Sequence, residues 1–346
     1  MKTMTVEKMQ AYLWSLPDQF QEIMQQGIDL PPRYKREYHS IIVTGLGGSA
    51  IGGDILRTYA LSRARIPILV NRDYDIPRFV NGDSLVLAVS YSGNTEETIS
   101  AYQQAVKQGA AVIAVTSGGK LAEMANNDEV AVVKIPGGLS PRAATGYLFA
   151  PLALILEELG IIQGTAADLE ETIKVLLAVR EGIHPGVDVS DNQARIIARE
   201  LKGNLPIIWG SSTHSEIAAM RWKTQINENA KTLAYFNIFP ELNHNEIVGL
   251  EVPAELMDRM VVIILRDSGD HQRVQSRIQI SKDIIQSKVK KIIEIDAQGE
   301  SFLARFYSMA YIGDYASFYL ALEYGINPTP VETIDYLKAE LAKSIN

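Results

Sequence analysis

The chain has 346 residues and a formal net charge of −8. It is 47% hydrophobic and 21% charged, which is typical of a folded protein with buried cores and excludes a disordered or fibrous chain. The acidic balance argues against a general nucleic-acid-binding protein, because such proteins neutralise phosphates with Lys and Arg. A phosphate ligand would therefore need a local site of backbone amides, hydroxyls and a few cations.

Cysteine is absent, which excludes disulfides, thiolate nucleophiles and cysteine-ligated zinc. A chain without cysteine suits a reducing compartment. Its histidines show no HxH or HExxH spacing, so we expect no metal site. The five are His39, His184, His214, His244 and His271.

No targeting or membrane-spanning segment is predicted. Residues 1–10 have no signal-peptide core. The longest apolar run, residues 147–156, contains Pro151 and is too short to cross a bilayer. We therefore expect a cytoplasmic protein with neither a membrane nor a nucleic-acid partner.

In the first half, strand and helix signals alternate. Residues 6–26, interrupted at Pro17, predict one or two helices. Short apolar runs then predict buried strands, and amphipathic stretches between them predict helices. The expected strands are residues 41–44, 68–70, 85–89 and 111–115, and the expected helices are residues 52–61, 95–107 and 121–126.

The second half repeats this pattern. Two helices at 146–159 and 165–181 and a linker at 182–186 precede it. Strands are then expected at 207–209, 260–265 and 291–295, and helices at 213–227, 270–287 and 301–324. Alternating strands and helices predict an α/β fold with two tandem domains, each a mainly parallel sheet flanked by helices. The expected divisions are a helical segment (1–34), a first domain (35–164), a helix and linker (165–191) and a second domain with C-terminal helices (192–346).

A glycine-rich turn follows the first predicted strand, at residues 44–53. Its Gly45, Gly47 and Ala50 match the spacing of a dinucleotide-binding fingerprint. That fold also requires an acid about 20 residues further on, and the nearest acids here lie later. We therefore expect no nicotinamide cofactor; a tight turn without a ligand remains the structural alternative.

The turn after the strand at 85–89 is rich in hydroxyl groups. Residues 90–97 are Ser-Tyr-Ser-Gly-Asn-Thr-Glu-Glu. Hydroxyls and backbone amides around a glycine, at the start of a helix, favour a phosphoryl group. A plain helix cap with Asn94 as the N-cap and Glu97 three residues on would be the alternative. Capping explains neither Ser90, Ser92 nor Gly93.

Residues 90–97 resemble the phosphate loop of the SIS (sugar isomerase) domain family, which has the pattern Ser-x-Ser-Gly-x-Thr-x-Glu. The resemblance implies two flavodoxin-like SIS domains and a phosphorylated sugar as the ligand. The expected phosphate-binding residues are Gly48, Ser49, Ser90, Ser92 and Thr95.

The second half contains a carboxylate and a histidine in two short motifs. Glu228 stands in Glu-Asn-Ala-Lys at the end of the helix predicted at 213–227. There the negative end of the helix dipole favours uptake of a proton, which suits a general base. His244 stands in Pro-Glu-Leu-Asn-His-Asn-Glu, which begins at Pro240. Alone, each would be interpreted as a solvated or structural residue.

Together the two motifs resemble the bifunctional phosphoglucose/phosphomannose isomerases, a branch of the SIS superfamily, from about residue 40 to the C-terminal helix. The resemblance implies that Glu228 carries the proton between C1 and C2. His244 would help to open the sugar ring and would come from the neighbouring subunit. Arg142, after the last strand of the first domain, and Lys338, in the C-terminal helix, match the family's active-site arginine and lysine.

The resemblance implies an aldose–ketose isomerase that interconverts glucose 6-phosphate, and mannose 6-phosphate, with fructose 6-phosphate. Arg142 would stabilise the enediolate intermediate. No metal or cofactor is required, and a homodimer with shared active sites is implied. Two alternatives stay open: another SIS-type phosphosugar isomerase, or a non-catalytic module that binds a sugar phosphate and regulates a partner.

Overall fold

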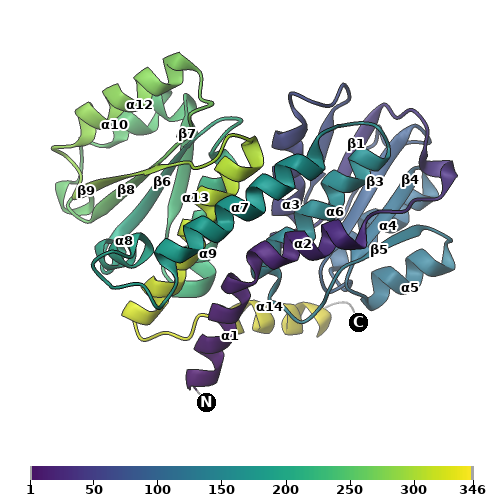
Figure 1. Ribbon diagram of the computed structural model, residues 1–346, viewed down its shortest axis with the longest axis horizontal. Helices are drawn as coiled ribbons and strands as arrows, with labels where there is room; N and C mark the ends of the chain where they lie inside the picture. The colour runs from purple at the N-terminus through teal and green to yellow at the C-terminus, as the bar shows by residue number, and fades with distance from the viewer. Residues whose placement is uncertain (1, 344–346) are drawn as a thin grey trace.

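The computed structural model describes residues 2–343 and contains two parallel sheets with helices on their faces (Figure 1). The first sheet has the strand order β2-β1-β3-β4-β5 and the second has the order β7-β6-β8-β9. The order of the first sheet is that of flavodoxin-like folds. The predicted fold class, two α/β units with parallel sheets, is confirmed.

The strands of the two sheets are short and parallel. Those of the first sheet are β1 (Ser40–Thr44), β2 (Ile68–Asn71), β3 (Ser84–Ser90), β4 (Ala111–Thr116) and β5 (Ala131–Lys134). Those of the second are β6 (Leu205–Ser211), β7 (Tyr235–Phe239), β8 (Met260–Arg266) and β9 (Lys291–Asp296).

The burial of β3 explains its apolar sequence. All seven of its residues are buried, because β1 and β4 pair with its two edges and helices cover both faces. A strand covered on both faces is apolar throughout and does not alternate between polar and apolar residues.

Fourteen α-helices surround the sheets within residues 2–343. Those of the first half are α1 (Lys2–Trp14), α2 (Leu16–Gln26), α3 (Gly48–Ala60), α4 (Glu96–Lys107), α5 (Gly119–Asn127), α6 (Thr145–Glu158) and α7 (Thr165–Ile183). Those of the second half are α8 (Gln193–Leu201), α9 (Glu216–Gln225), α10 (Glu246–Gly249), α11 (Ala254–Met257), α12 (Gln272–Ile285), α13 (Phe302–Glu323) and α14 (Glu332–Lys343).

Helix α13 joins the two halves of the molecule. It packs against α7, α8 and α9, and lies near the middle of the view in Figure 1. Eighteen of its residues are buried. The hydroxyl of Tyr311 donates a hydrogen bond to the Leu13 carbonyl at 2.8 Å, which ties α13 to the N-terminal helix. One continuous apolar core therefore extends from α1 and the first sheet to the second sheet.

The longest helix of residues 2–343 is α13, and neither it nor any other helix there is long and apolar enough to cross a membrane.

Several predicted boundaries differ from the structure, and three of the differences have a clear physical cause. The N-terminal helix breaks at Ser15, two residues before Pro17, because proline is tolerated in the first turn of α2. Helix α3 begins at Gly48, so part of the predicted glycine-rich turn is helical. Helix α9 begins at Glu216, three residues later than expected, because Thr213 has a φ of 67°, which a right-handed helix does not accept.

A helical glycine in α13 allows the close approach of a buried tryptophan. A Cβ atom on Gly313 would lie 2.3 Å from the indole nitrogen of Trp222, which donates to the Met309 carbonyl. Gly182, in α7, has no heavy atom of the described residues within 4 Å of the corresponding position.

We predict that Gly313→Ala lowers the free energy of unfolding by about 1–3 kcal/mol, because the added methyl group overpacks the core. Gly182→Ala, the matched control in an open helical position, should raise it by about 0.5–1 kcal/mol. Urea-induced unfolding of both variants measures the difference. Equal effects of the two substitutions would contradict the packing argument.

Candidate active site

The hydroxyl-rich turn lies where the strand order of the first sheet reverses direction. From β1 the chain passes to β2 on one side, and β3 then pairs with β1 on the other. The turns after β1 and β3 therefore lie side by side at the carboxyl edge of the sheet, where open α/β sheets bind their ligands. The Tyr91 amide donates to the Ser49 hydroxyl at 3.3 Å and joins the two turns.

The turn after β3 brings together the hydroxyl groups that the sequence predicted. The oxygens of Ser90 and Thr95 are 2.9 Å apart. The Gly93 amide donates to the Ser90 hydroxyl at 3.1 Å, and the Asn94 amide donates to the Ser92 hydroxyl at 3.3 Å. Ser90 is buried, whereas Ser92 is exposed. The turn after β3 thus presents hydroxyl and amide groups close together, and the Ser92 side chain is accessible to a ligand.

The helix-cap interpretation of this turn is wrong. The N-cap residue of α4 is Thr95, and no side chain in the described part of the chain caps the helix. The Asn94 side chain instead accepts a hydrogen bond from the Lys120 amide and donates one to the Ser92 carbonyl. Its role is therefore to join this turn to the start of α5, and the first amides of α4 are left for a ligand or water.

Glycine is required at position 93 for two reasons. Its φ is 71°, in the left-handed region, and a Cβ atom would lie 1.7 Å from the Gly118 carbonyl oxygen. The turn after β3 and the turn after β4 therefore approach each other backbone to backbone.

Arg142 connects these turns to the second half of the chain. The preceding residue, Pro141, lies against Gly48: a Cβ on Gly48 would be 2.6 Å from the Pro141 oxygen. The Arg142 side chain is only 6% exposed. Its Nε donates to the Asn229 side chain at 2.7 Å, and one terminal nitrogen donates to the carbonyls of Pro328 and Thr329 at 2.7 and 2.8 Å.

The other terminal nitrogen of Arg142 faces Glu228, with 3.5 Å between the nitrogen and the carboxylate oxygen. Burial lowers the pKa of Arg142, and the neighbouring Glu228 carboxylate acts in the opposite direction. Glu228 lies in a π-helical turn, Ile226–Ala230, which continues α9. Such turns are frequent at functional sites, because they displace side chains from the regular helical positions.

A hollow of about 640 Å³ opens beside Glu228. Lys231 also lines it, and the residue has a left-handed backbone with a φ of 55°. Its amino group donates to the carbonyls of Glu228 and Pro328. Burial, and secondly the charge of Arg142, lower the pKa of Lys231. The other lining residues come from the π turn and the segment between it and β7, from the segment between α13 and α14, and from the first turn of α14. They are Asn227, Thr232, Leu233, Ile326, Asn327, Pro330, Val331, Glu332, Thr333 and Ile334.

A buried polar network contacts the main chain of Arg142. Arg221 pairs with Asp314 at 2.7 Å and also donates to the Arg142 carbonyl at 3.0 Å. Gln225 donates to the same carboxylate at 2.8 Å. Burial raises the pKa of Asp314, and Arg221 opposes that change. Sequence reasoning missed this network and the Asn229 contact, although Asn229 and Lys231 stand in the motif that drew attention to Glu228.

Within residues 2–343, neither His244 nor Lys338 forms a hydrogen bond or an ion pair with Glu228 or Arg142. His244 is exposed at the end of a 3₁₀ turn, Glu241–His244, that follows β7. Glu228 precedes β7, so the two residues lie toward opposite ends of a strand that spans about 16 Å. Lys338 is exposed on α14, one helical turn beyond Ile334, which lines the hollow. Within one chain the structure thus separates His244 from Glu228.

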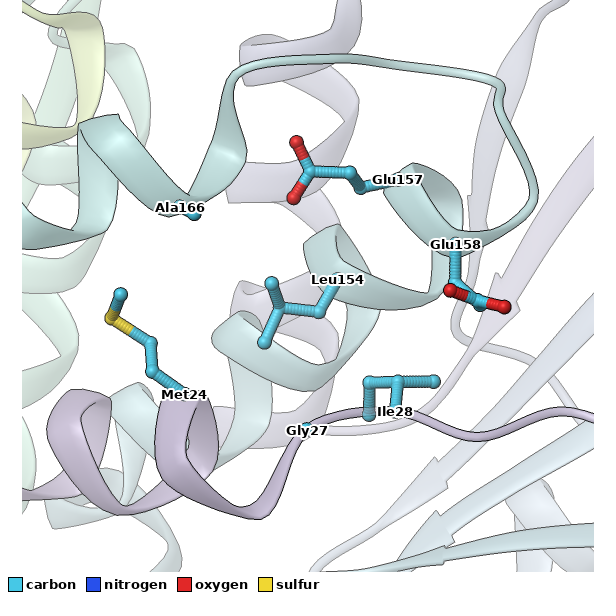
Figure 2. Close-up of a pocket in the computed structure, with 7 residues that line it drawn as sticks. All are labelled: Met24, Gly27, Ile28, Leu154, Glu157, Glu158 and Ala166. Atoms are coloured by element: carbon cyan, nitrogen blue, oxygen red, sulfur yellow. The ribbon is translucent and has the colours of Figure 1, made fainter.

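A smaller cavity of about 210 Å³ lies between α2, α6 and α7 (Figure 2). Two carboxylates, Glu157 and Glu158, line it together with apolar groups. Glu157 accepts from the Thr165 amide and Glu158 pairs with Lys35. Because this negative, apolar cavity would repel a phosphate, it is not the predicted site. Within residues 2–343, the His, Asp and Glu side chains form no group of three that could hold a metal.

The fold and the hydroxyl-lined turn define a protein of the SIS (sugar isomerase) class. Residues 36–136 match the SIS domain, and residues 190–341 match the bacterial phospho-glucose isomerase C-terminal SIS domain. A solved structure, a glucose-6-phosphate isomerase like protein from Thermus thermophilus, shares the fold. Its TM-score is 0.62 at 20% identity, over 92% of this chain and 93% of that one.

Relatives with higher sequence identity than this structure show which family within the SIS class the chain belongs to. The bifunctional phosphoglucose/phosphomannose isomerase of Caldicellulosiruptor bescii is 47% identical over 96% of this chain and 98% of its own length. The enzyme of the same description from Aquifex aeolicus is 36% identical over 88% of this chain and 91% of its own. The chain belongs to the bifunctional phosphoglucose/phosphomannose isomerase family.

The contact between the turns after β3 and β4 generates a prediction. Gly109 has a φ of 75° and, among the described residues, no heavy atom within 4 Å of a Cβ position, so it is a matched control for Gly93. Gly109→Ala should lower the free energy of unfolding by about 1–2 kcal/mol, from left-handed strain alone. Gly93→Ala should lower it by about 1–3 kcal/mol more, because the methyl group also meets the Gly118 carbonyl. Urea titration measures both, and equal losses would contradict the close approach.

Proposed function

We propose that this protein is an aldose–ketose isomerase that interconverts glucose 6-phosphate, and mannose 6-phosphate, with fructose 6-phosphate. Family membership supports the activity. The observation that carries the proposal for this chain is the Arg142 bridge. Through Pro141 its loop packs against Gly48 in the turn after β1, and its guanidinium faces the Glu228 carboxylate of the second half. A phosphate held at one end would present the sugar carbons at the other.

The phosphate docks on Gly48, Ser49, Ser90, Ser92 and Thr95. Ser92 is exposed, the Ser90 and Thr95 hydroxyls are 2.9 Å apart, and the uncapped amides of α4 point the positive end of the helix dipole at an anion. Binding of the phosphate away from the reacting carbons holds the substrate in register, which converts proton transfer into an intramolecular step.

Glu228 is the base. It removes the C2 proton of the open-chain aldose and returns it to C1, while a second proton moves between the C1 and C2 oxygens. The cis-enediolate intermediate carries negative charge, which the buried guanidinium of Arg142 stabilises more strongly than a solvated cation would. Rotation about the C2–C3 bond of the intermediate would present either face of C2, and thus admits both the glucose and the mannose epimer.

His244 and Lys338 complete the site. They transfer the proton that opens the sugar ring before isomerisation. Since His244 lies at the far end of β7 from Glu228 within one chain, the proposal requires His244 of a second subunit. The protein is accordingly a homodimer with shared active sites. Helix α14, which carries Lys338, lines the hollow with its first turn, and this supports the role proposed for Lys338.

Neither a metal nor a redox cofactor takes part in this reaction, since acid–base groups move both protons. The reaction belongs to glycolysis and gluconeogenesis, and a cytoplasmic location suits it. We also propose the domain division at 1–34, 35–164, 165–191 and 192–346. The first domain then supplies the phosphate site and Arg142, and the second supplies Glu228, His244 and Lys338.

A coupled assay of fructose 6-phosphate formation from each aldose phosphate, with EDTA present, tests the function. We expect activity with both substrates. Glu228→Gln keeps the size of the side chain but removes the base, so kcat should fall by about 10²–10⁴-fold. Glu332→Gln, at an exposed residue that lines the same hollow, is the control and should leave kcat within about threefold. Retained activity in Glu228→Gln would move the base elsewhere, and inactive wild type would refute the function.

Shared sites predict that two inactive variants restore each other. Glu228→Gln and His244→Ala homodimers should each be nearly inactive. Random mixing places both lesions in one site of a mixed dimer and leaves its other site intact, so up to about one quarter of wild-type activity should return. Subunits that exchange, as shown by mass spectrometry of differently tagged chains, yet recover nothing would mean that each site is built from one chain.

A further inference from the structure

One proton of the proposed reaction has no carrier among the residues assigned so far. Glu228 moves the carbon-bound proton from C2 to C1, but a second proton must pass from the C2 oxygen to the C1 oxygen. Among the described residues that line the hollow, three titrate: Glu228, Lys231 and Glu332. Glu332 is an exposed carboxylate, whose charge would repel an enediolate. Lys231 is the cation of the three, so it can give a proton to an oxygen that becomes negative.

Lys231 has a backbone conformation that favours glycine. It ends the π turn with a φ of 55° and a ψ of 32°, in the left-handed region. Glycine is the usual residue at such a helix end, and another residue there costs about 1–2 kcal/mol. Strained residues of this kind are found mainly at active sites and switch regions. The strain therefore supports a function for the Lys231 side chain.

A closed ring of contacts keeps the Lys231 ammonium close to Arg142 and Glu228. The ammonium donates to the Glu228 carbonyl and, at 3.4 Å, to the Pro328 carbonyl. The Pro328 carbonyl also accepts a hydrogen bond from Arg142 at 2.7 Å. Arg142 in turn faces the Glu228 carboxylate at 3.5 Å. The ring thus begins at the main chain of Glu228 and ends at its side chain.

The Lys231 ammonium has a hydrogen left for a substrate. It carries three hydrogens, and within residues 2–343 its hydrogen-bond partners are two carbonyls, those of Glu228 and Pro328. Burial, and secondly the charge of Arg142, lower the pKa of Lys231, whereas the charges of Glu228 and Glu332 raise it. A lysine that releases its proton more readily than usual is suited to act as an acid and then as a base.

We propose that Lys231 is a further catalytic residue, which carries the second proton between the C2 and C1 oxygens of the substrate. The inference rests on the proposed function. One ammonium can serve both oxygens, because they lie on the same side of a cis-enediolate. Arg142 cannot do so, since a guanidinium stays protonated in proteins.

The proton transfers balance. When Glu228 removes the C2 proton of the open-chain aldose, the electron pair of that bond forms the C1–C2 double bond, and the C1 oxygen becomes negative. The Lys231 ammonium gives this oxygen a proton, and the resulting amine takes the proton of the C2 oxygen. The C2 carbonyl then forms while Glu228 returns its proton to C1. Both side chains end in the protonation states in which they began.

Lys231→Arg separates proton transfer from the positive charge. Arginine keeps the charge and the N–H donors but does not release a proton. In D₂O the variant should still exchange the C2 hydrogen of glucose 6-phosphate, because Glu228 is intact, while fructose 6-phosphate formation falls by about 10²–10⁴-fold. NMR of the recovered aldose measures the exchange, and the coupled assay measures isomerisation.

The ratio of exchange to isomerisation decides the matter. It should rise by about tenfold or more in Lys231→Arg. Lys223→Arg, which changes a lysine of α9 outside the residues that line the hollow, is the matched control and should keep the wild-type ratio. If Lys231 only held the π turn in place, both rates would fall together; that result, or unchanged rates, overturns the proposal. Wild-type protein that neither exchanges nor isomerises refutes the proposed function itself.

A second variant covers the case in which Lys231→Arg fails to fold. Lys231→Gly fits the left-handed backbone and removes the ammonium. Methylamine should restore isomerisation in proportion to its concentration, because it can give and take a proton in place of the side chain. Guanidinium at the same concentration should not, because it stays protonated. Restoration by both cations, or by neither, overturns the proposal.

Discussion

The buried guanidinium of Arg142 is the interaction on which the arrangement of the site depends. A charge removed from water costs several kcal/mol unless hydrogen bonds and an opposite charge replace its solvation. The Asn229 side chain and the carbonyls of Pro328 and Thr329 replace it here, and Glu228 supplies the charge. Arg142 is therefore satisfied only when the loop after the first sheet, the π turn and the segment before α14 are all in place.

A second buried pair keeps those segments at the right distance. Arg221 and Asp314, each about 2% exposed at the side chain, join α9 to α13, and Arg221 also holds the main chain of Arg142. Asn229 accepts a hydrogen bond from Arg142, and its amide group donates one to the Ser317 hydroxyl of α13 at 2.9 Å. Because these hydrogen bonds cross from α9 to α13 and to the Arg142 loop, they restrict the relative position of the three segments.

The groups proposed for chemistry lie where regular elements end. The turns proposed to bind phosphate follow β1 and β3, Glu228 lies in a π turn, His244 ends a 3₁₀ turn, and the hollow borders the segment before α14. At these transitions, backbone amides and side chains are not used up by the ladder or the helix. The rigid sheets and α13 hold these irregular segments in position.

Local sequence determined the hydroxyl turn and the α/β fold class. The hydroxyl and amide groups of residues 90–95 form hydrogen bonds with one another, and buried parallel strands are continuous apolar runs. The sequence also singled out Glu228 and Arg142, but it did not predict that their side chains form an ion pair. The partners of Arg142 lie up to 187 residues away, and only packing brings them together. The cap was misassigned to Asn94 because tertiary contacts with Lys120 and Ser92 engage its side chain. Strands β5 and β7 were also missed. Both lie at the edge of a sheet, and in β7 polar and apolar residues do not alternate, so only the fold shows that Tyr235 and Phe236 lie exposed.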